Sequence, residues 1–300
     1  MDKYLIIVND KANNSQAFKS AKALDTLLSN SERKYIDAEN INYNEILNET
    51  DAEIRIVIAG GDGTLNRFIN TVDTNHLTRD IYYYPAGSGN DFARDVGKSR
   101  EDPPFVINEY LKDLPTVTVN GQTSKFLNGI GYGIDGYCCE IGDKIRAVSD
   151  KPVNYTAIAI KGLLGGFTPT NATVTVDGKK YKFAKTWLAP TMNGRYFGGG
   201  IMPTPNQDRL NPDRYVSIAI MQGIGRLNAL RIFPSMFKGE HIKYKKVIHI
   251  RKAFDVKVQF DRPTALQIDG ETVLNVLEYS VSGCKTAKTI QTDTKSFVKG

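Results

Sequence analysis

A glycine turn that contains one acid has the residue types of a site that handles phosphate. Residues 60–66 have the sequence Gly-Gly-Asp-Gly-Thr-Leu-Asn and follow the apolar run 54–59, which is typical of a buried strand. Glycines let an anion approach the backbone amides, and a helix that begins just after them, with Asp62 or Thr64 as its cap, adds the positive end of its dipole. Because Asp62 is unusual in a site that only holds an anion, we expect a metal ion or a catalytic hydrogen bond there.

A second glycine turn follows a second predicted strand. Residues 81–84 have the sequence Ile-Tyr-Tyr-Tyr, and residues 85–94 continue as Pro-Ala-Gly-Ser-Gly-Asn-Asp-Phe-Ala-Arg. Ligands of open α/β sheets bind at the carboxyl ends of strands. We therefore expect the two turns to belong to one binding site.

Together the two turns resemble the catalytic domain of the diacylglycerol kinase family, which includes bacterial lipid kinases and sphingosine kinases. The family pattern is Gly-Gly-Asp-Gly-Thr followed by Gly-Thr/Ser-x-Asn-Asp-Phe-Ala-Arg, and this chain has both in order. The resemblance extends from Tyr4 to about Gly283. It implies transfer of the γ-phosphate of ATP, with Mg²⁺, to a hydroxyl of diacylglycerol or a related lipid alcohol.

The resemblance assigns roles to residues of both turns. It places Asp62 and Asp91 in the catalytic network and Asn9, at the end of the first predicted strand, on the adenosine side. The other implied nucleotide contacts are Gly60, Gly61, Gly63, Thr64, Asn66, Gly87, Ser88 and Asn90. The chain departs from the family at Arg67, where a glutamate is usual, and this loss of a carboxylate predicts altered acceptor recognition or weakened activity.

A third motif lies late in the chain, where residues 269–271 have the sequence Asp-Gly-Glu. The resemblance makes Asp269 the general base that takes the proton of the acceptor hydroxyl, and Glu271 a contact of the metal or of ATP-linked waters. Asp-Gly is also a common hairpin turn, so the same residues could serve only to reverse the chain.

A fourth region resembles the structural Mg²⁺ site of bacterial members, whose pattern is Asp-Gly-x-Leu-Asp. The aligned residues 213–217 have the sequence Asp-Arg-Tyr-Val-Ser, so the glycine and the second aspartate are missing. Asp213 and Asp208 remain as candidate metal ligands.

Residues 131–136 match a dinucleotide-binding fingerprint by letter, but no βαβ unit is expected around them. We predict a backbone-tight wall of the cleft there instead.

The elements around these motifs predict two domains. Strands over 4–9, 33–37, 54–59 and 81–84 alternate with helices over 15–29, 41–49 and 65–72, which indicates a Rossmann-like parallel sheet with helices on both faces. Many short β-rich runs follow Pro115, with a hairpin turn at Asp177-Gly178 and helices over 154–164 and 226–237.

We therefore predict an α/β protein with the two-domain lipid kinase or NAD kinase-like architecture. A nucleotide-binding α/β domain is expected over 1–117 and an antiparallel, β-sandwich-like lipid-substrate domain over 118–284. The tail 285–300 is expected to return to the first domain, and ATP is expected between the two.

Composition limits the setting in which the protein works. The net charge is +6, and 41% of the residues are hydrophobic. No run of eighteen apolar residues, signal peptide or nucleic-acid recognition motif is visible, and three cysteines lack metal spacing. These features predict a cytoplasmic protein that does not bind nucleic acid. The resemblance implies that it is an enzyme, peripheral at the inner membrane surface. A homodimer through the β-rich domain is possible by resemblance.

An apolar stripe near basic residues has two interpretations. Its members are Leu227, Leu230, Phe233, Met236 and Phe237. The stripe could rest on an anionic bilayer, or it could pack on the protein's own core.

Two other functions remain open from the sequence. An NAD kinase shares the first turn and the two-domain plan, although the run 90–94 argues against it. Alternatively, Arg67 and Ser217 could mark a catalytically weakened member that binds nucleotide or lipid as a regulator.

Overall fold

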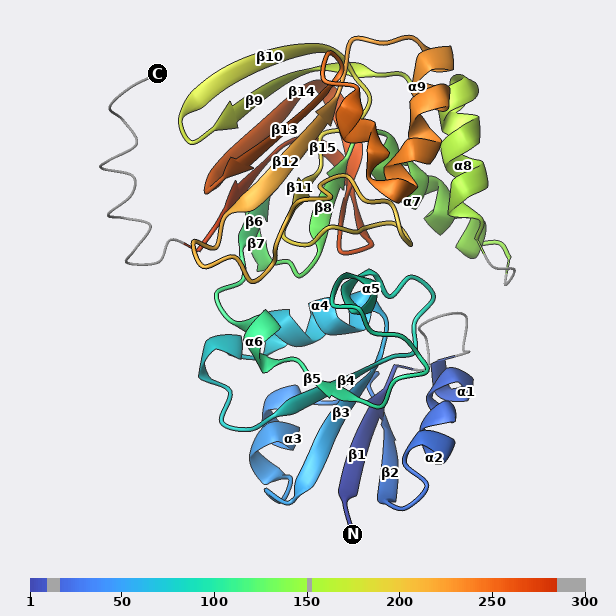
Figure 1. Ribbon diagram of the computed structural model, residues 1–300, viewed down its shortest axis with the longest axis vertical. Coiled ribbons are helices and arrows are strands. Elements are labelled where there is room, and N and C mark those ends of the chain that lie inside the picture. The colour runs from blue at the N-terminus through green and yellow to red at the C-terminus, as the bar shows by residue number, and fades with distance from the viewer. Residues whose placement is uncertain (10–16, 150–152, 285–300) are drawn as a thin grey trace. The chain divides into compact units, whose positions relative to one another are not determined.

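A computed structural model describes residues 1–9, 17–149 and 153–284 of the chain, which form two compact units (Figure 1). The first unit contains Met1–Lys112 together with Gly198–Gly200. The second contains Asp113–Ser149, Val153–Phe197 and the chain from Ile201 onwards. The predicted return of the tail 285–300 lies outside the described residues. No helix in the described parts is both long and apolar enough to cross a bilayer.

The first unit is built on a five-stranded sheet with the order β2-β1-β3-β4-β5. Its strands are β1 (Lys3–Val8), β2 (Glu32–Asp37), β3 (Ile54–Gly60), β4 (Ile81–Pro85) and β5 (Phe105–Val106). The first four run parallel, and only β5, at the edge, runs antiparallel to its neighbour β4. This confirms the predicted parallel-sheet domain.

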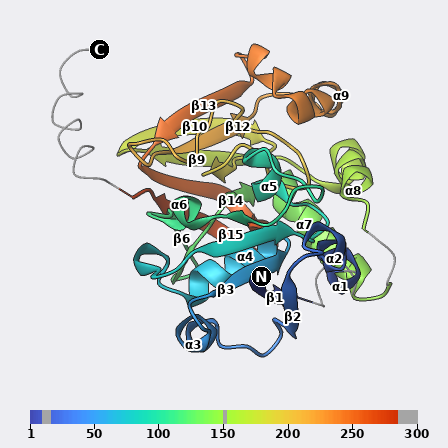
Figure 2. The ribbon, with the colours of Figure 1, turned by 60° about the horizontal axis from the view of Figure 1, so that its bottom comes forward.

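Helices cover both faces of this sheet (Figure 2). On one face α1 (Ala17–Ala21) and α2 (Ala23–Leu27) contribute to a core with β1, β3 and β4. On the other lie α3 (Tyr43–Glu49) and α4 (Asp62–Thr71), joined by an edge-on contact of Tyr43 with Phe68. Shorter elements are η1 (Thr74–His76), α5 (Asp91–Asp95) and α6 (Asn108–Leu111).

Two helix predictions in this unit need correction. The single helix expected over 15–29 is two short helices that meet at Lys22. The helix expected over 65–72 begins three residues earlier, so Gly61 is its N-cap residue, and Asp62 and Thr64 lie inside its first turn. Asp62 and Thr64 therefore do not cap the helix as expected, because the helix already begins within the glycine turn.

The second unit is a large antiparallel sheet with the order β13-β12-β11-β8-β14-β15-β6-β7, and β9 joins β10 to β14. The strands are β6 (Thr116–Val119), β7 (Gln122–Lys125), β8 (Gly129–Tyr132), β9 (Thr170–Val176), β10 (Lys179–Thr186), β11 (Thr191–Met192), β12 (Val216–Met221), β13 (Ile248–Ala253), β14 (Asp255–Ile268) and β15 (Glu271–Ser282). The predicted turn at Asp177-Gly178 connects β9 to β10, with both residues at positive φ.

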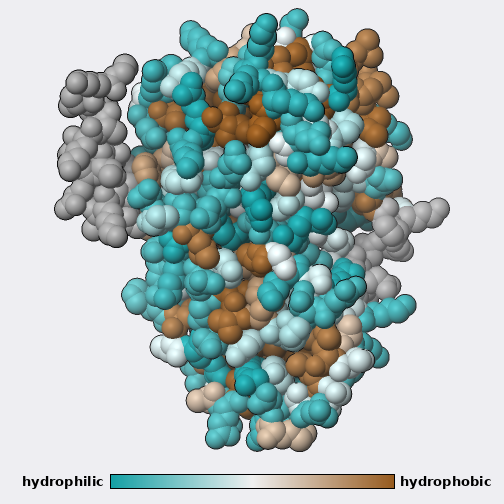
Figure 3. Space-filling view, viewed as in Figure 1, coloured by the Kyte–Doolittle hydropathy of each residue, from teal (hydrophilic) through white to brown (hydrophobic). Residues whose placement is uncertain are grey.

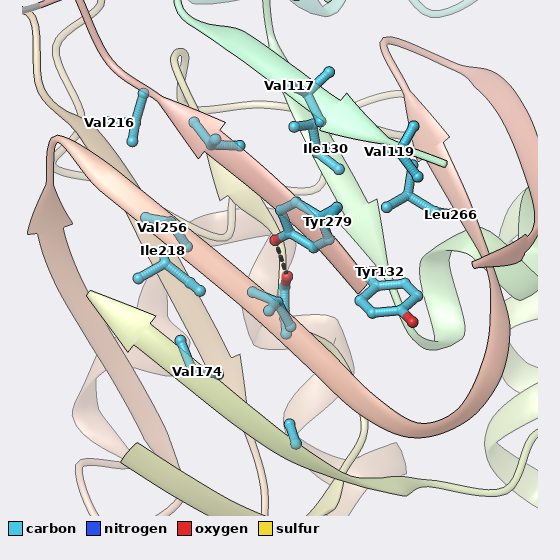
Figure 4. Packing of buried hydrophobic residues seen from close by; sticks show 14 of the residues in the cluster. Val117, Val119, Ile130, Tyr132, Val174, Val216, Ile218, Val256, Leu266 and Tyr279 are labelled. Atoms are coloured by element: carbon cyan, nitrogen blue, oxygen red, sulfur yellow. Dashed lines mark hydrogen bonds between the residues drawn. The ribbon is translucent and has the colours of Figure 1, made fainter. Parts of the chain in front are cut away.

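Strand β14 folds this sheet around its core. Its first half pairs with β9 and its last three residues pair with β8, and the register shifts between these halves near Pro263. β-Branched and aromatic side chains fill the space inside, including Val174, Ile218 and Tyr279 (Figure 4). Tyr132 stacks on Phe260 with ring centroids 3.9 Å apart.

A helical layer packs against this unit. Its elements are α7 (Ile134–Arg146), α8 (Tyr155–Lys161), the π-helical turn η2 (Gly162–Gly166), α9 (Arg226–Ile232), η3 (Phe233–Lys238) and η4 (Glu240–Lys243). Helix α7 is absent from the sequence prediction, which interpreted residues 131–136 as a tight wall. The glycines there serve packing, because a Cβ on Gly136 would lie 1.9 Å from the carbonyl oxygen of Ala265.

Candidate active site

Three strands of the first unit end at the same edge of the parallel sheet. Val8 of β1 lies opposite Ala59 of β3, and Gly60 of β3 lies opposite Pro85 of β4. Asn9 and the two glycine turns follow directly, and the Asn9 side-chain amide donates to the Thr64 hydroxyl over 3.4 Å. The structure thus gathers the predicted nucleotide contacts of this unit in one place.

The two glycine turns pass each other with their backbones in contact. A Cβ on Gly87 would lie 2.3 Å from the Cα of Gly61, a separation that real Cβ atoms do not reach. A Cβ on Gly60 would lie 2.4 Å from the Thr64 hydroxyl oxygen. The N–H of Ala86 donates to the carbonyl of Gly60 over 3.0 Å. The glycines are therefore required by the fold of the turns as well as by any ligand.

The start of helix α4 lies at this contact. Gly61 is the N-cap residue and provides no side chain to cap the first backbone amides of this ten-residue helix. The helix dipole places partial positive charge at the same end. A glycine turn together with a helix start has the composition of a phosphate-binding site.

The Asp62 carboxylate connects the two turns. It accepts the backbone N–H groups of Asp91 and Phe92, each over 2.9 Å, and so caps helix α5 from the other turn. The predicted catalytic role of Asp62 therefore coexists with a structural one. Replacing this side chain would alter the geometry of both turns.

Asp91 is buried and close to a second carboxylate. Burial, and next the charge of Asp62, raise its pKa to about 7. One carboxylate oxygen accepts the N–H of Gly199 over 2.8 Å. The other has no hydrogen-bond partner in the described part of the chain, and neither has the Oδ1 atom of Asn90. Two orphaned oxygens on consecutive residues are suitable partners for Mg²⁺ or for waters bound to it.

The remaining predicted residues of these turns lie away from the contact between Gly61 and Gly87, or are exposed. Ser88 is exposed, and Asn66 accepts a bond from the Asn70 side chain one helical turn away. Arg67, which replaces the family's glutamate, is exposed and donates to the carbonyl of Glu39 over 3.0 Å. Its guanidinium thus ties α4 to the loop after β2.

Two residues that support the turns were missed from the sequence. The buried Tyr83 hydroxyl donates to the carbonyl of Gly60 over 2.9 Å, and burial raises the pKa of this phenol well above its usual value. Arg100 donates to the carbonyl of Pro85 over 3.1 Å and to that of Gly87. A tyrosine in a strand and an arginine in a loop carry no motif signal, so only the folded chain identifies them.

Asp269, in the second unit, holds three consecutive backbone amides. Its carboxylate accepts the N–H groups of Leu127, Asn128 and Gly129, over 2.6, 2.8 and 3.0 Å. It lies with Gly270 in the turn between β14 and β15, and both residues have positive φ. Asp269 and Gly270 thus form a hairpin turn, and the role of general base stays a prediction. Glu271 is exposed at the start of β15.

The residues around Asp208 and Asp213 do not fit a metal site. The Asp208 carboxylate accepts the N–H of Leu210 over 2.9 Å, as in a turn. No group of three histidine, cysteine, aspartate or glutamate side chains with metal-site spacing occurs among the described residues. The side chains that fill the loop are instead N–H donors.

Comparisons with known proteins agree with this geometry. The model of the diacylglycerol kinase catalytic domain matches residues 3–119, and that of the YegS C-terminal NAD kinase beta sandwich-like domain matches residues 128–280. This chain belongs to the diacylglycerol kinase family.

Members with curated names have moderate sequence similarity to it. A diacylglycerol kinase of Mycobacterium tuberculosis is 27% identical to this chain, and the match covers 70% of this chain and 68% of the relative. A diacylglycerol kinase of Bacillus subtilis (strain 168) is 28% identical, and the match covers 72% of this chain and 70% of the relative. A crystal structure of a diacylglycerol kinase from Bacillus anthracis str. Sterne has a TM-score of 0.58 at 19% identity, over 95% of this chain and 94% of that one. At this identity the last match supports the fold alone.

The backbone contact between the turns predicts that one added methyl group at Gly87 destabilises the protein. We expect Gly87→Ala to lower the free energy of unfolding by about 2 kcal/mol or more, because the Cβ cannot fit without separating the turns. Gly225→Ala is the matched control, since a Cβ there meets nothing within 4 Å. Urea denaturation of both variants measures the difference, and equal stability would contradict the contact.

The raised pKa of Asp91 predicts that the free energy of unfolding depends on pH. Between about pH 4 and pH 7 the folded protein keeps a proton that the unfolded chain has lost, so this group lowers the free energy of unfolding as pH rises through that window. Asp91→Asn removes the titration and keeps an oxygen for the Gly199 N–H. We expect the variant to gain stability relative to wild type from pH 5 to pH 8, measured by urea denaturation without nucleotide or Mg²⁺. Parallel pH profiles would refute this.

Proposed function

We propose that the protein is a lipid kinase that transfers the γ-phosphate of ATP to a hydroxyl of diacylglycerol or a related lipid alcohol. The observation that carries the proposal is the contact of two glycine turns at the start of helix α4, beside the carboxylates of Asp62 and Asp91. The named relatives add the class of acceptor.

In this proposal the turns bind the phosphates of ATP through backbone amides and the α4 dipole. Asn90 and Asp91 each have one side-chain oxygen without a hydrogen-bond partner among the described residues. These oxygens would hold the Mg²⁺ or its waters, and the ion would neutralise charge on the phosphates. Asp62 keeps these two residues in place through its bonds to the start of α5. Asp269 would take the proton of the acceptor hydroxyl.

The test is phosphorylation of diacylglycerol in mixed micelles with labelled ATP, and we expect labelled phosphatidic acid. Gly89→Ala tests the ATP site, because a Cβ at Gly89 would lie 3.4 Å from its nearest neighbour, the Asp62 carboxylate, and so fits the fold. The methyl would stand beside the carboxylates where a phosphate must approach. We expect the KM for ATP to rise about tenfold with an unchanged melting temperature. Gly225→Ala is again the control.

Other outcomes separate the rival functions. Labelled NADP without labelled lipid would establish an NAD kinase. Binding of ATP without any product from a total lipid extract would establish a regulator. Asp269→Asn requires a melting curve beside its activity, because its carboxylate also holds three backbone amides.

A lipid kinase must reach its substrate at a bilayer, and we propose peripheral contact through one part of the second unit. Of the apolar stripe predicted there, Phe233 and Met236 are buried in the core, whereas Leu227 is 80% exposed. Leu164, in the turn η2, is 58% exposed. Arg226 donates to carbonyls of this turn, over 3.2 Å at Leu163 and 2.8 Å at Phe167, so Leu227 is held beside it.

Charge favours an anionic bilayer as the partner of this surface. The chain from 225 to 246 carries six lysines and arginines and one acid, Glu240. Figure 3 shows hydrophobic surface, with hydrophilic residues around it, over the part of the second unit that carries α8 and α9 in Figure 1. Two exposed leucines among basic residues have the composition of an interfacial contact.

This surface predicts a loss of vesicle binding in Leu164→Ser/Leu227→Ser. We expect at least tenfold weaker sedimentation with phosphatidylglycerol vesicles, since each leucine would lose about 1.5 kcal/mol or more of burial in the bilayer. The control is Leu27→Ser, an exposed leucine of α2 in the first unit. Unchanged binding by the double variant would place the contact elsewhere.

A further inference from the structure

Residues 203–215, the part of the chain before β12 in the second unit, form a loop that is held by buried polar side chains. Gln207, Arg209 and Asn211 are 4%, 6% and 3% exposed. This is the region in which the sequence resembles a structural metal site. A buried loop needs partners for its backbone carbonyls, and either a cation or N–H donors can supply them.

Amide side chains satisfy the carbonyls of this loop. The Gln207 amide donates to the carbonyls of Tyr215 over 3.0 Å and Asn193 over 3.3 Å, and its oxygen accepts the hydroxyl of Ser217 over 2.6 Å. The Asn211 amide donates to the carbonyls of Asp208 over 2.6 Å and Tyr215 over 3.0 Å. The carbonyl oxygens of Asn193, Asp208 and Tyr215 therefore already accept N–H groups.

Arg209 extends this arrangement to the segment Leu127–Gly129. Its guanidinium donates to the side-chain oxygen of Asn128 over 3.0 Å and to the carbonyl of Leu127 over 3.4 Å. The N–H groups of the same three residues donate to the Asp269 carboxylate. Arg209 and Asp269 thus hold this segment through different polar groups.

We propose that the side-chain amides of Gln207 and Asn211 take the place of a structural metal ion in this loop, and that the Arg209 guanidinium, which the loop carries, positions Asp269 through the segment Leu127–Gly129. A guanidinium is a fixed cation whose several donors point in set directions, so it satisfies carbonyl oxygens and supplies positive charge together. Ser217 stands where the metal pattern has its second aspartate, and its hydroxyl donates to Gln207. An aspartate there would face the Gln207 oxygen.

The structural half of the proposal does not depend on the reaction and is tested by melting curves without nucleotide. The protein measured is Asp91→Asn, which lacks the acid proposed to hold the Mg²⁺ of the ATP site. We expect its melting temperature to be the same for the protein as purified, after dialysis against EDTA, and after Mg²⁺ is added back. A melting temperature that falls with EDTA and recovers with Mg²⁺ in this variant would overturn the proposal.

Variants at two positions sharpen this test. Arg209→Met should lower the melting temperature by about 5 °C or more, because the buried side-chain oxygen of Asn128 loses this donor and the Leu127 carbonyl loses one of its two. Arg209→Lys, which keeps one charged donor group, should recover part of the loss. The control is Arg231→Met, an exposed arginine of α9. Ser217→Asp should destabilise the protein with or without Mg²⁺, and stabilisation by Mg²⁺ in this variant would count against the proposal.

The positioning half rests on the proposed kinase function. With a short-chain diacylglycerol, and rates normalised to folded protein, Arg209→Met should lower kcat at least tenfold and leave the KM for ATP within twofold. Arg209→Lys should restore part of kcat. An unchanged kcat would overturn the positioning role alone. Failure of wild type to phosphorylate lipid would instead refute the function and leave the melting results valid. If Arg209→Met does not fold, the lysine variant and the EDTA series decide.

Discussion

The contact between the backbones of Gly61 and Gly87 is the constraint on which the candidate site depends. Strands β3 and β4 are neighbours in the sheet, with Gly60 opposite Pro85, so the turns that follow them must share one small space. A Cβ on Gly87 would lie 2.3 Å from the Cα of Gly61 and would separate the turns, and a Cβ on Gly61 would crowd Gly87 at 3.2 Å. Their proximity then brings the start of α4 and the start of α5 together, and Asp62 can bridge the two.

Aspartates perform structural work at each predicted catalytic position. Asp62 caps α5, Asp91 holds the Gly199 amide, and Asp269 holds three amides before and within β8. A carboxylate that accepts several N–H groups is held in one orientation, which is also what a catalytic group requires. Loss of activity in an aspartate variant is therefore weak evidence for chemistry unless the stability of the same variant is known.

The features that could be predicted from the sequence are those encoded by residues close together in the chain. Alternating strands and helices, the glycine turns and the hairpin at Asp177-Gly178 are encoded by neighbouring residues, and the predicted α/β architecture is confirmed. Helix α7 was missed because closely spaced glycines are typical of a loop. In the fold, Gly136 is needed because the carbonyl of Ala265 packs against it, and Gly133 because the carbonyl of Trp187 does. Arg100 and Arg209 were missed for a related reason. Their partners lie 13 or more residues away, and no spacing rule connects them.

Under the proposal above, donors and acceptors of the loop before β12 replace a metal pattern together. Removal of a carboxylate alone would leave carbonyl oxygens without partners, which is costly in a buried loop. Here Ser217 donates where an aspartate would accept, and Gln207 and Asn211 supply N–H groups to the carbonyls. Acceptors and donors have to change together, since either change alone leaves unpaired groups. The absence of a metal motif in a sequence of this family therefore does not by itself indicate a failed site.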